Sequence, residues 1–338
     1  MKKKIISIFV CVLTIVATIP ALGKMIEPES VLINGLENNQ ETINEIIFKK
    51  SENLALPHQA KTIRHHLLKR SYLLYVPSSY DGTNPVPLVV VFHGGQSTPE
   101  NASERFGVSE KAEEEGFIVV YPDASWIMYN VWNIGLGWYT KNLFREIMRW
   151  WIDEVGFTKK IIAQTQKDYN IDPDRIYLAG HSNGAMMAYY FGVLHSDIIA
   201  AIASNGGCIG GHIQDFEMVM IPEPDNPVSI AIFHGELDQL IPYYGGWNVN
   251  NKFFCTSVAE AVPFWVENNG CDPDPVTETI GNVTIDLYSG GEAGTEIIVY
   301  TVHNKGHIWF GGPPWEDPNP EISTTDEMWE FFKTHPKK

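Results

Sequence analysis

The chain has 338 residues, of which 44% are hydrophobic and 12% aromatic, and this is enough to bury one large core. It carries 24 Lys and Arg against 41 Asp and Glu, a formal net charge of −17, and so acidic a chain is poorly suited to binding nucleic acid or an anionic membrane. No internal repeat or low-complexity block divides the sequence, so we expect one folded domain.

Residues 1–23 have the pattern of a secretory signal peptide. Three lysines precede an apolar run at residues 5–19, and small side chains for cleavage follow at residues 21–23. The run is shorter than the roughly 20 residues that a membrane-spanning helix needs. Cleavage would leave 21 basic against 41 acidic residues, a formal charge of −20. We therefore expect an exported protein, extracellular or periplasmic, that has no membrane contact after cleavage.

The rest of the chain is expected to form a polar extension at residues 24–60 and an α/β domain at residues 61–338. Strand-like runs occupy residues 71–76, 87–92 and 117–121, and the second of them is almost uninterrupted, as in a parallel sheet covered on both faces. Strand-like and helix-like runs then alternate, which is typical of βαβ units. We predict a mostly parallel central sheet flanked by helices, with ligands at the carboxyl ends of the strands.

A G-x-S-x-G pattern at residues 180–184 lies between a strand-like run at residues 176–179 and a helix-like run at residues 185–190. A serine hydroxyl becomes a good nucleophile when a tight turn between strand and helix holds it beside a base and backbone N–H donors. The two glycines allow such a turn to close without side-chain collisions. Ser182 is therefore the candidate nucleophile.

A second turn, His93-Gly94-Gly95, follows the strand-like run at residues 87–92. Backbone N–H groups on such a turn can hold the negative oxygen of a tetrahedral intermediate. Gly95 and Asn183 are the candidate oxyanion-hole donors. A Gly-Gly turn that only ends a strand is the alternative, and the position upstream of the serine motif favours the functional role.

The acid of such a site is expected after the serine and before the base. The apolar run at residues 228–233 opens into a polar loop that contains Glu236 and Asp238. A carboxylate there could fix the tautomer of a histidine and stabilise its protonated form. Asp238 is the candidate acid and Glu236 the alternative.

Three histidines follow the candidate acid. His307 heads a loop beyond the last strand-like run at residues 297–302, His303 ends that run, and His335 lies in the tail after a helix. We expect His307 to be the base because a loop position places the ring at the carboxyl edge, and His303 is the alternative.

Two further groups of residues could bind ligands. Trp309, next to the candidate base, and the aromatic residues Tyr243 and Trp247 are candidates for substrate binding, although large aromatic side chains are often simply core. The pair His65-His66 could suggest a metal, but adjacent residues of a strand point to opposite faces. We expect no metal site and no cofactor.

Taken together, these motifs resemble the secreted α/β-hydrolases of the polyhydroxybutyrate depolymerase and feruloyl esterase group, over about residues 70–335. The segments that carry the resemblance are HGGQS at 93–97, DEVGF at 153–157, YNIDPDRIY at 169–177, GHSNGAMM at 180–187, HGELD at 234–238 with PY at 242–243, WVENNGC at 265–271 and GHIW at 306–309. The resemblance implies a serine esterase with Ser182, Asp238 and His307 as its triad.

The chain departs from the group's usual pattern at two places. Many members carry cysteines after a Trp-Asn-Ala-Gly segment, whereas this chain has Trp132-Asn133-Ile134-Gly135 and a longer stretch after it. Phe310 stands where a proline is common. These residues are expected to edge the acyl pocket, so the substrate is the least transferable part of the resemblance.

The expected activity is hydrolysis of feruloyl or acetyl esters of plant polysaccharide. A polyhydroxybutyrate depolymerase is the alternative within the same chemistry. An acyltransferase would use the same triad, and a non-catalytic carbohydrate-binding protein would be expected to lack at least one of its members. The oligomeric state is left open.

The mature chain has three cysteines, Cys208, Cys255 and Cys271. A helix expected at residues 257–268 separates the last two by roughly 20 Å, too far for a disulfide. We expect Cys208–Cys255 if any bridge forms. The resemblance implies a partner for Cys271 in the following strand, where this chain has Gly290-Gly291, so Cys271 is expected to be free.

Overall fold

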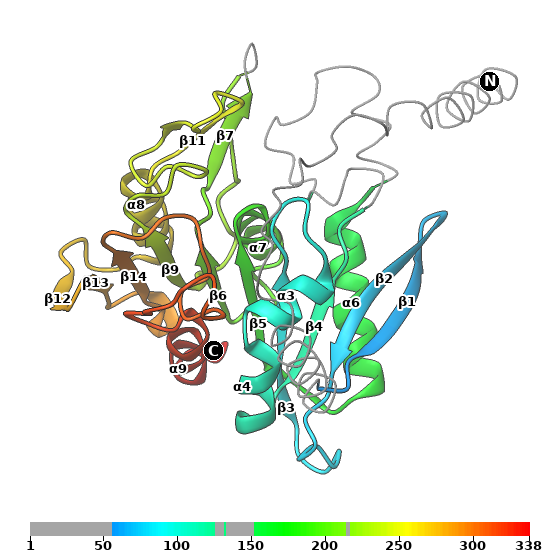
Figure 1. The fold of residues 1–338 in the computed structure, drawn as a ribbon. Helices are drawn as coiled ribbons and strands as arrows, with labels where there is room; N and C mark the ends of the chain where they lie inside the picture. Colours follow the sequence, from blue (N-terminus) through cyan, green and yellow to red (C-terminus); the bar gives the residue numbers. More distant parts are fainter. Residues whose placement is uncertain (1–55, 126–131, 133–151, 214–216) are drawn as a thin grey trace, which may run out of the picture. The chain divides into compact units, whose positions relative to one another are not determined.

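A ten-stranded sheet runs through the described part of the chain (Figure 1). The structure, a computed structural model, describes residues 56–338 apart from 126–131, 133–151 and 214–216, and the expected signal peptide lies outside these residues. In order across the sheet the strands are β1 (Gln59–His65), β2 (Leu68–Tyr75), β4 (Ile118–Pro122), β3 (Val86–Phe92), β5 (Ile171–His181), β6 (Ala201–Asn205), β9 (Ser229–Gly235), β14 (Ile297–Val302), β13 (Val283–Tyr288) and β12 (Val276–Ile280).

The middle of this sheet is parallel, from β4 through β3, β5, β6 and β9 to β14, and the outer strands pair antiparallel. Almost every residue of β3 and β9 is buried, as expected for strands that are covered on both faces. The predicted parallel sheet is confirmed, and the last predicted strand coincides with β14.

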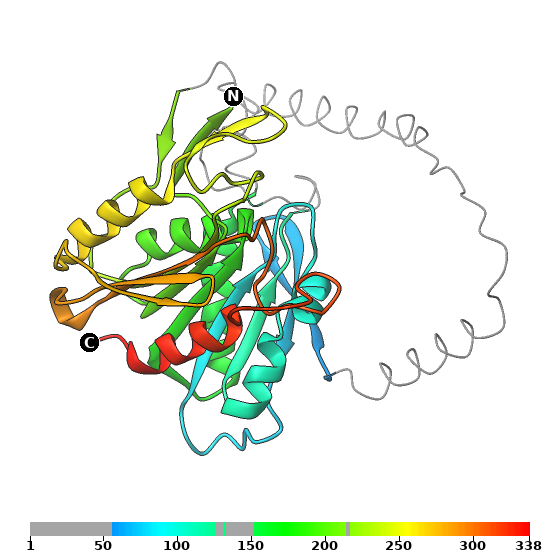
Figure 2. The ribbon, with the colours of Figure 1, turned by 60° about the vertical axis from the view of Figure 1, so that its left-hand side comes forward.

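Helices cover both faces of the sheet (Figure 2). On β3, Leu88 and Val90 pack in one core cluster and Val89 and Val91 in the other, because alternate side chains of a strand point to opposite faces. The helices that contribute to the first cluster are α6 (Glu154–Asp168), α7 (Asn183–Leu194) and α8 (Val258–Asn269), and those of the second are α3 (Pro99–Arg105), α4 (Val108–Glu115) and α9 (Thr324–Thr334). The short 3₁₀ helix η3 (Glu292–Gly294) precedes β14. The chain therefore forms three layers, helices, sheet and helices.

A second, four-stranded sheet extends from the carboxyl ends of β6 and β9. Its order is β10 (Gly246–Trp247), β11 (Phe253–Cys255), β7 (Gly210–Ile213) and β8 (Val219–Met220). The chain enters it twice, once after β6 and once after β9, so this small sheet adjoins the edge at which ligands are expected. None of the helices built from the described residues is long and apolar enough to cross a membrane.

The turn between β1 and β2 corrects one step of the sequence argument. His65 is the last residue of β1, and His66 lies in the turn with a positive φ of 49°. The alternation of side chains along a strand therefore ends before His66. Both rings lie next to the same carboxylate, that of Asp153, at 3.2 and 3.6 Å.

The three cysteines are free and buried. The thiol of Cys255 donates a hydrogen bond to Cys208, and this bond, which stabilises the protonated form, is the main cause that raises the pKa of Cys255. Cys271 lies at the other end of α8, where an added Cβ on Gly291 would come within 2.8 Å of its sulfur. Glycine thus occupies the place from which a partner cysteine would reach Cys271.

We predict that the exported protein, mapped without reduction, contains a Cys208–Cys255 cross-link and an alkylatable Cys271. Disulfides form outside the reducing cytosol, and these two thiols already lie together. The measurement is peptide mapping by mass spectrometry, with a reduced sample as control. A Cys208–Cys271 cross-link would contradict the packing of α8.

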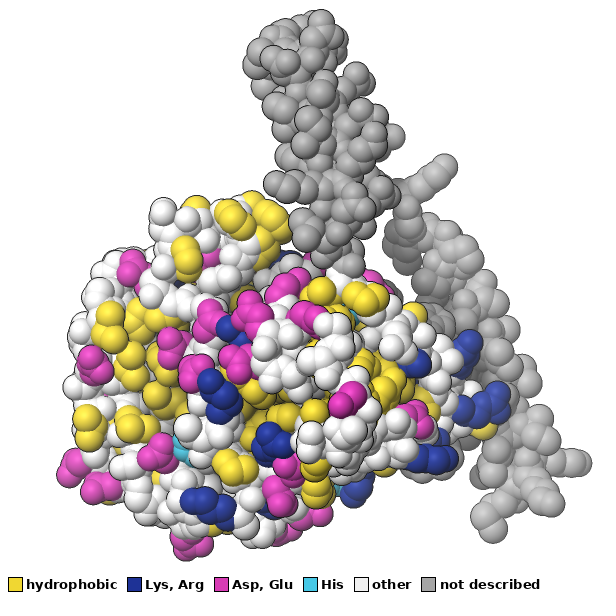
Figure 3. Space-filling view, turned by 90° about the horizontal axis from the view of Figure 1, so that it is seen from below, with side chains coloured by type: hydrophobic (Ala, Val, Ile, Leu, Met, Phe, Trp, Pro, Cys, Tyr) yellow, Lys and Arg dark blue, Asp and Glu magenta, His cyan; other side chains and the backbone are white. Residues whose placement is uncertain are grey.

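The surface seen from below carries acidic, basic and hydrophobic side chains interspersed (Figure 3). The excess of acidic residues, 41 against 24 basic ones, is not gathered into a single patch on this face.

Candidate active site

Ser182 stands on a strained turn between β5 and α7. Its φ of 58° and ψ of −125° are rarely adopted by residues other than glycine. An added Cβ on Gly180 would lie 2.3 Å from the carbonyl oxygen of Gly184, and one on Gly184 would lie 2.2 Å from that of Phe92. The two glycines are thus required for the close approach of strand, turn and helix, as the motif predicted.

Asp238 and His307 form a hydrogen-bonded pair at this end of the sheet. The ring Nδ1 of His307 donates to Asp238 Oδ2 at 2.6 Å. The other carboxylate oxygen accepts the backbone N–H groups of Leu240 and Ile241 at 2.8 and 2.9 Å. Asp238 is 5% exposed, and these three hydrogen bonds fix both the carboxylate and the tautomer of the imidazole, with Nε2 left as the acceptor.

The pKa of Asp238 lies well below its ordinary value. Burial acts to raise this pKa, but hydrogen bonds from His234 and His307 and the charges of both rings outweigh it. His234 Nε2 is 3.4 Å from Asp238 Oδ2. The carboxylate is therefore ionised at neutral pH and can stabilise a protonated His307.

The alternatives for the acid and the base have other partners. Glu236 binds His303 Nδ1 at 2.8 Å, and His303 Nε2 contacts Thr284 at 2.9 Å. His335 contacts Glu296 at 3.1 Å. Asp238 is therefore paired with His307, and Glu236 with His303.

Ser182 and His307 reach the same edge through neighbouring residues. The N–H of Ser182 donates to the carbonyl of Asn205 at 2.9 Å, and an added Cβ on the next residue, Gly206, would lie 3.2 Å from the ring of His307. The ring of His181 is 4.7 Å from that of His307. Among the described residues the Ser182 hydroxyl makes no hydrogen bond, and such catalytic bonds often tighten only when substrate is bound.

The candidate oxyanion turn lies beside the serine. An added Cβ on Gly94 would be 3.6 Å from Ser182 Cβ. The turn is closed by a hydrogen bond from the N–H of Ser97 to the Gly94 carbonyl at 3.2 Å, and Gly95 is exposed at its tip. Gly95 directly follows the glycine that lies beside Ser182, and Asn183 directly follows Ser182 at the N-terminus of α7, so both roles in the oxyanion hole stay predictions.

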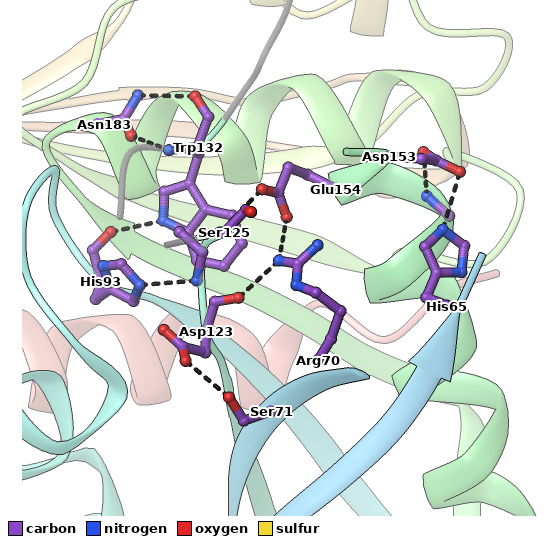
Figure 4. Close-up of polar contacts among 12 residues, drawn as sticks. His65, Arg70, Ser71, His93, Asp123, Ser125, Trp132, Asp153, Glu154 and Asn183 are labelled. Carbon is purple, nitrogen blue, oxygen red and sulfur yellow. Dashed lines mark hydrogen bonds and ion pairs between the residues drawn. The ribbon is translucent and has the colours of Figure 1, made fainter. Parts of the chain in front are cut away.

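His93 and Trp132 hold this turn from behind (Figure 4). His93 Nε2 accepts the N–H of Ala124 at 3.1 Å, and Nδ1 therefore donates to the Gly94 carbonyl at 2.7 Å. Burial lowers the pKa of His93 to about 4, which keeps the ring neutral. The indole N–H of Trp132 donates to the His93 carbonyl at 2.8 Å.

Asn183 completes this support with its side chain. Its Oδ1 accepts the backbone N–H of Trp132 at 2.7 Å. The residue after the nucleophile is therefore tied to the segment that holds the Gly94-Gly95 turn. The sequence contained these residues in its motifs, but nothing in it indicated that Trp132 and His93 would contact each other.

The aromatic candidates have different surroundings. Trp309 is 1% exposed; its ring stacks on Phe106 at 4.2 Å and its N–H donates to Thr325. The expectation that Trp309 binds substrate is wrong, because the ring is part of the core. Tyr243 is half-buried with its hydroxyl on Thr301, whereas Trp247 on the small sheet is 39% exposed.

Sequence reasoning missed Tyr244, which is 71% exposed. Its ring is 5.0 Å from that of Tyr243, and its hydroxyl donates to Glu236. The adjacent tyrosines after the polar loop were the available signal. Tyr244 and Trp247 are the residues of this loop that present open aromatic faces.

A hollow of about 280 Å³ lies at the other end of the strands. Ala200, Pro227 and His335 are among its lining residues, and they lie at the amino ends of β6 and β9 and after α9. Its position at the amino ends separates it from Ser182 and His307. This cavity is therefore not part of the candidate active site, which is identified by the geometry of its residues.

Comparison with known proteins agrees with this geometry. Residues 70–221 match the family model described as Esterase PHB depolymerase. Feruloyl esterase B of Piromyces equi is 29% identical over 245 residues, which covers 70% of this chain and 42% of that protein. The chain is similar to esterases of the polyhydroxybutyrate depolymerase and feruloyl esterase group. It spans less than half the length of that Piromyces relative.

Solved structures of this esterase group share the fold. The acetyl xylan esterase from Aspergillus awamori is 16% identical and superposes with a TM-score of 0.56, over 82% of this chain and 99% of that one. A ferulic acid esterase from Anaeromyces mucronatus, solved in complex with ferulic acid, is 17% identical with a TM-score of 0.52, over 82% and 90%. Both similarities identify the α/β-hydrolase fold. At these identities they do not identify the substrate of this chain.

Proposed function

We propose that this protein hydrolyses carboxylic esters with Ser182 as nucleophile, His307 as base and Asp238 as acid. The observation that carries the proposal is the hydrogen bond of 2.6 Å between His307 and Asp238, at the sheet edge where Ser182 occupies its strained turn. The relatives of this chain are esterases, and the chain has the residues that such chemistry requires.

In the first half of the reaction, Ser182 Oγ attacks the ester carbonyl carbon and its proton passes to Nε2 of His307. The negative oxygen of the intermediate is held by the N–H groups of Gly95 and Asn183. His307 then returns the proton to the alcohol as the C–O bond breaks. Water repeats these steps on the acyl-enzyme and releases the acid. No cofactor or metal takes part in these steps.

We propose feruloyl or acetyl esters of plant polysaccharide as the substrates. Two relatives, each 29% identical, are feruloyl esterase B of Piromyces equi and a bifunctional acetylxylan esterase/xylanase of Neocallimastix patriciarum. Three aromatic residues are exposed: Tyr244 by 71%, Trp247 by 39% and Trp315 by 80%. Such rings can stack on sugars or on an aromatic acid. A polyester is the second candidate, because the matching family model is that of polyhydroxybutyrate depolymerases.

A panel of four substrates tests this choice. Methyl ferulate, p-nitrophenyl acetate, acetylated xylan and a short hydroxybutyrate polymer are offered to the purified mature protein, and kcat/KM is measured for each. We expect the ferulate and xylan esters to be hydrolysed best. Hydrolysis of the hydroxybutyrate polymer alone would favour the polyester, and ester formation with an added acceptor alcohol would favour an acyltransferase.

We predict that Trp247→Ala raises KM for acetylated xylan without changing kcat/KM for p-nitrophenyl acetate. An aromatic contact is worth about 0.5–1.5 kcal/mol, so KM should rise roughly two- to tenfold. Val276→Ala, which shortens another exposed apolar side chain on edge strand β12, serves as the control. Equal losses on both substrates would mean that Trp247 supports the site rather than binds the polymer.

Export remains part of the proposal. We propose that residues 1–23 are removed as a signal peptide, because the charged start, the short apolar run and the small residues after it have that order. Sequencing of the protein recovered from the medium or the periplasm should begin after residue 23. A product that still starts at Met1 would contradict it.

A further inference from the structure

A cluster of His65, His66 and Asp153 lies outside the candidate active site. It joins the turn after β1 to the start of α6, and Asp153 is the N-cap residue of that helix. One ligand atom from each of the three residues lies within 4.8 Å of the other two. In Figure 4 the His65–Asp153 pair lies on the far side of Arg70 and Glu154 from Trp132.

Two distances in this cluster match those of a bound zinc ion. Zinc bonds of about 2.0–2.1 Å in tetrahedral arrangement separate neighbouring ligand atoms by roughly 3.3 Å. His65 Nε2 is 3.2 Å from Asp153 Oδ2, and His66 Nε2 is 3.6 Å from the same oxygen. The His66 side chain is 37% exposed in the turn after β1, so one side of the cluster is open to solvent.

The backbone around the cluster makes room for the carboxylate. An added Cβ on Gly156 would lie 2.1 Å from Asp153 Oδ2 and 3.0 Å from the ring of His65. Any other residue at this position would therefore fill the space in which the carboxylate meets the rings. The second oxygen of Asp153 accepts the N–H of Gly156 at 2.8 Å, which fixes Oδ2 toward the histidines.

Two nearby positive charges, those of Arg70 and Lys160, have other partners. Arg70 binds Glu154 at 2.6 Å, and the ammonium of Lys160 donates to the carbonyl of Arg64 at 2.6 Å. Two imidazole nitrogens and one carboxylate oxygen are ligands suited to zinc and similar divalent ions.

We propose that His65, His66 and Asp153 bind a divalent transition-metal ion, with Zn²⁺ as the best fit, and that the ion clips the β1–β2 turn to the N-terminus of α6. Water completes the coordination at the exposed side. The role is structural and does not depend on ester hydrolysis, because the cluster contributes no group to the reaction.

Titration of the metal-stripped, untagged mature protein with ZnCl₂, followed by calorimetry, tests the proposal. We expect one Zn²⁺ per chain. His66→Asn suits the positive φ and Asp153→Asn keeps a good N-cap, so both variants should fold, and each should bind at least about tenfold more weakly, since even loss of an outer-shell partner costs 10–100-fold. Zn²⁺ should raise the melting temperature of the wild type and not that of the variants.

His303→Asn is the matched control, because His303 also contacts a carboxylate, at 2.8 Å, but without a second histidine. It should bind Zn²⁺ like the wild type. The proposal is overturned if the wild type shows no saturable binding, if both cluster variants bind as well as the wild type, or if His303→Asn loses binding to the same extent.

Discussion

Replacement of Ser182 by alanine is expected to abolish ester hydrolysis while the protein stays folded. The change removes the one oxygen that attacks the carbonyl, and loss of a triad nucleophile lowers kcat by about 10⁴ to 10⁶. Among the described residues the Ser182 hydroxyl makes no hydrogen bond, so its removal leaves no buried partner unsatisfied. The close contacts at Gly180 and Gly184 are with backbone atoms of other residues, so the substitution leaves them unchanged.

The measurement is kcat on p-nitrophenyl acetate, together with circular dichroism and the melting temperature. Ser71→Ala is the control. It removes a hydroxyl bonded to Asp123 at the surface and should keep the kcat of the wild type. A folded Ser182→Ala protein with a tenth of wild-type activity would end the serine-esterase proposal. That result would not bear on the proposed metal site, because the metal site is tested by Zn²⁺ binding and not by activity.

Replacement of His307 by alanine is expected to cost nearly as much. The ring takes the serine proton and returns it to the leaving alcohol, and triad members that act as a unit are lost together. Asp238, at 5% exposure, would then lose the closer of its two histidine partners. We therefore also expect a lower melting temperature, because an ionised group that loses a partner keeps its cost of burial.

His303→Ala is the control for this prediction. His303 is paired with Glu236 and Thr284, so its loss should leave kcat within a small factor of the wild type. The two variants are compared by kcat/KM on the same small ester. A severe loss in His303→Ala with a mild one in His307→Ala would show that the base has been assigned to the wrong histidine.

The parallel sheet and the serine turn could be predicted because their physics is local. Strands buried on both faces must be apolar almost throughout, and β3, β9 and β14 are. The turn that holds Ser182 needs glycine at residues 180 and 184, since an added Cβ at either would meet backbone atoms at 2.2–2.3 Å. Chain order then led to Asp238 and His307, whose contact the structure contains.

Other features could not be predicted because they depend on contacts between distant segments. Trp309 sits next to the base in sequence, yet Phe106 and Thr325 enclose it. The strands of the small sheet have two to four residues each, too few for a periodic pattern. The rule of strand alternation failed at His66 because a turn begins there.

The packing around His307 bears on how the base is prepared for reaction. Its ring lies against that of His181 at 4.7 Å, Gly206 leaves only enough space for a hydrogen on another side, and Asp238 holds Nδ1. A free imidazole must lose rotational freedom in each turnover before it can accept a proton. Here that entropy is given up once, when the chain folds, and every later encounter with substrate finds the ring already oriented.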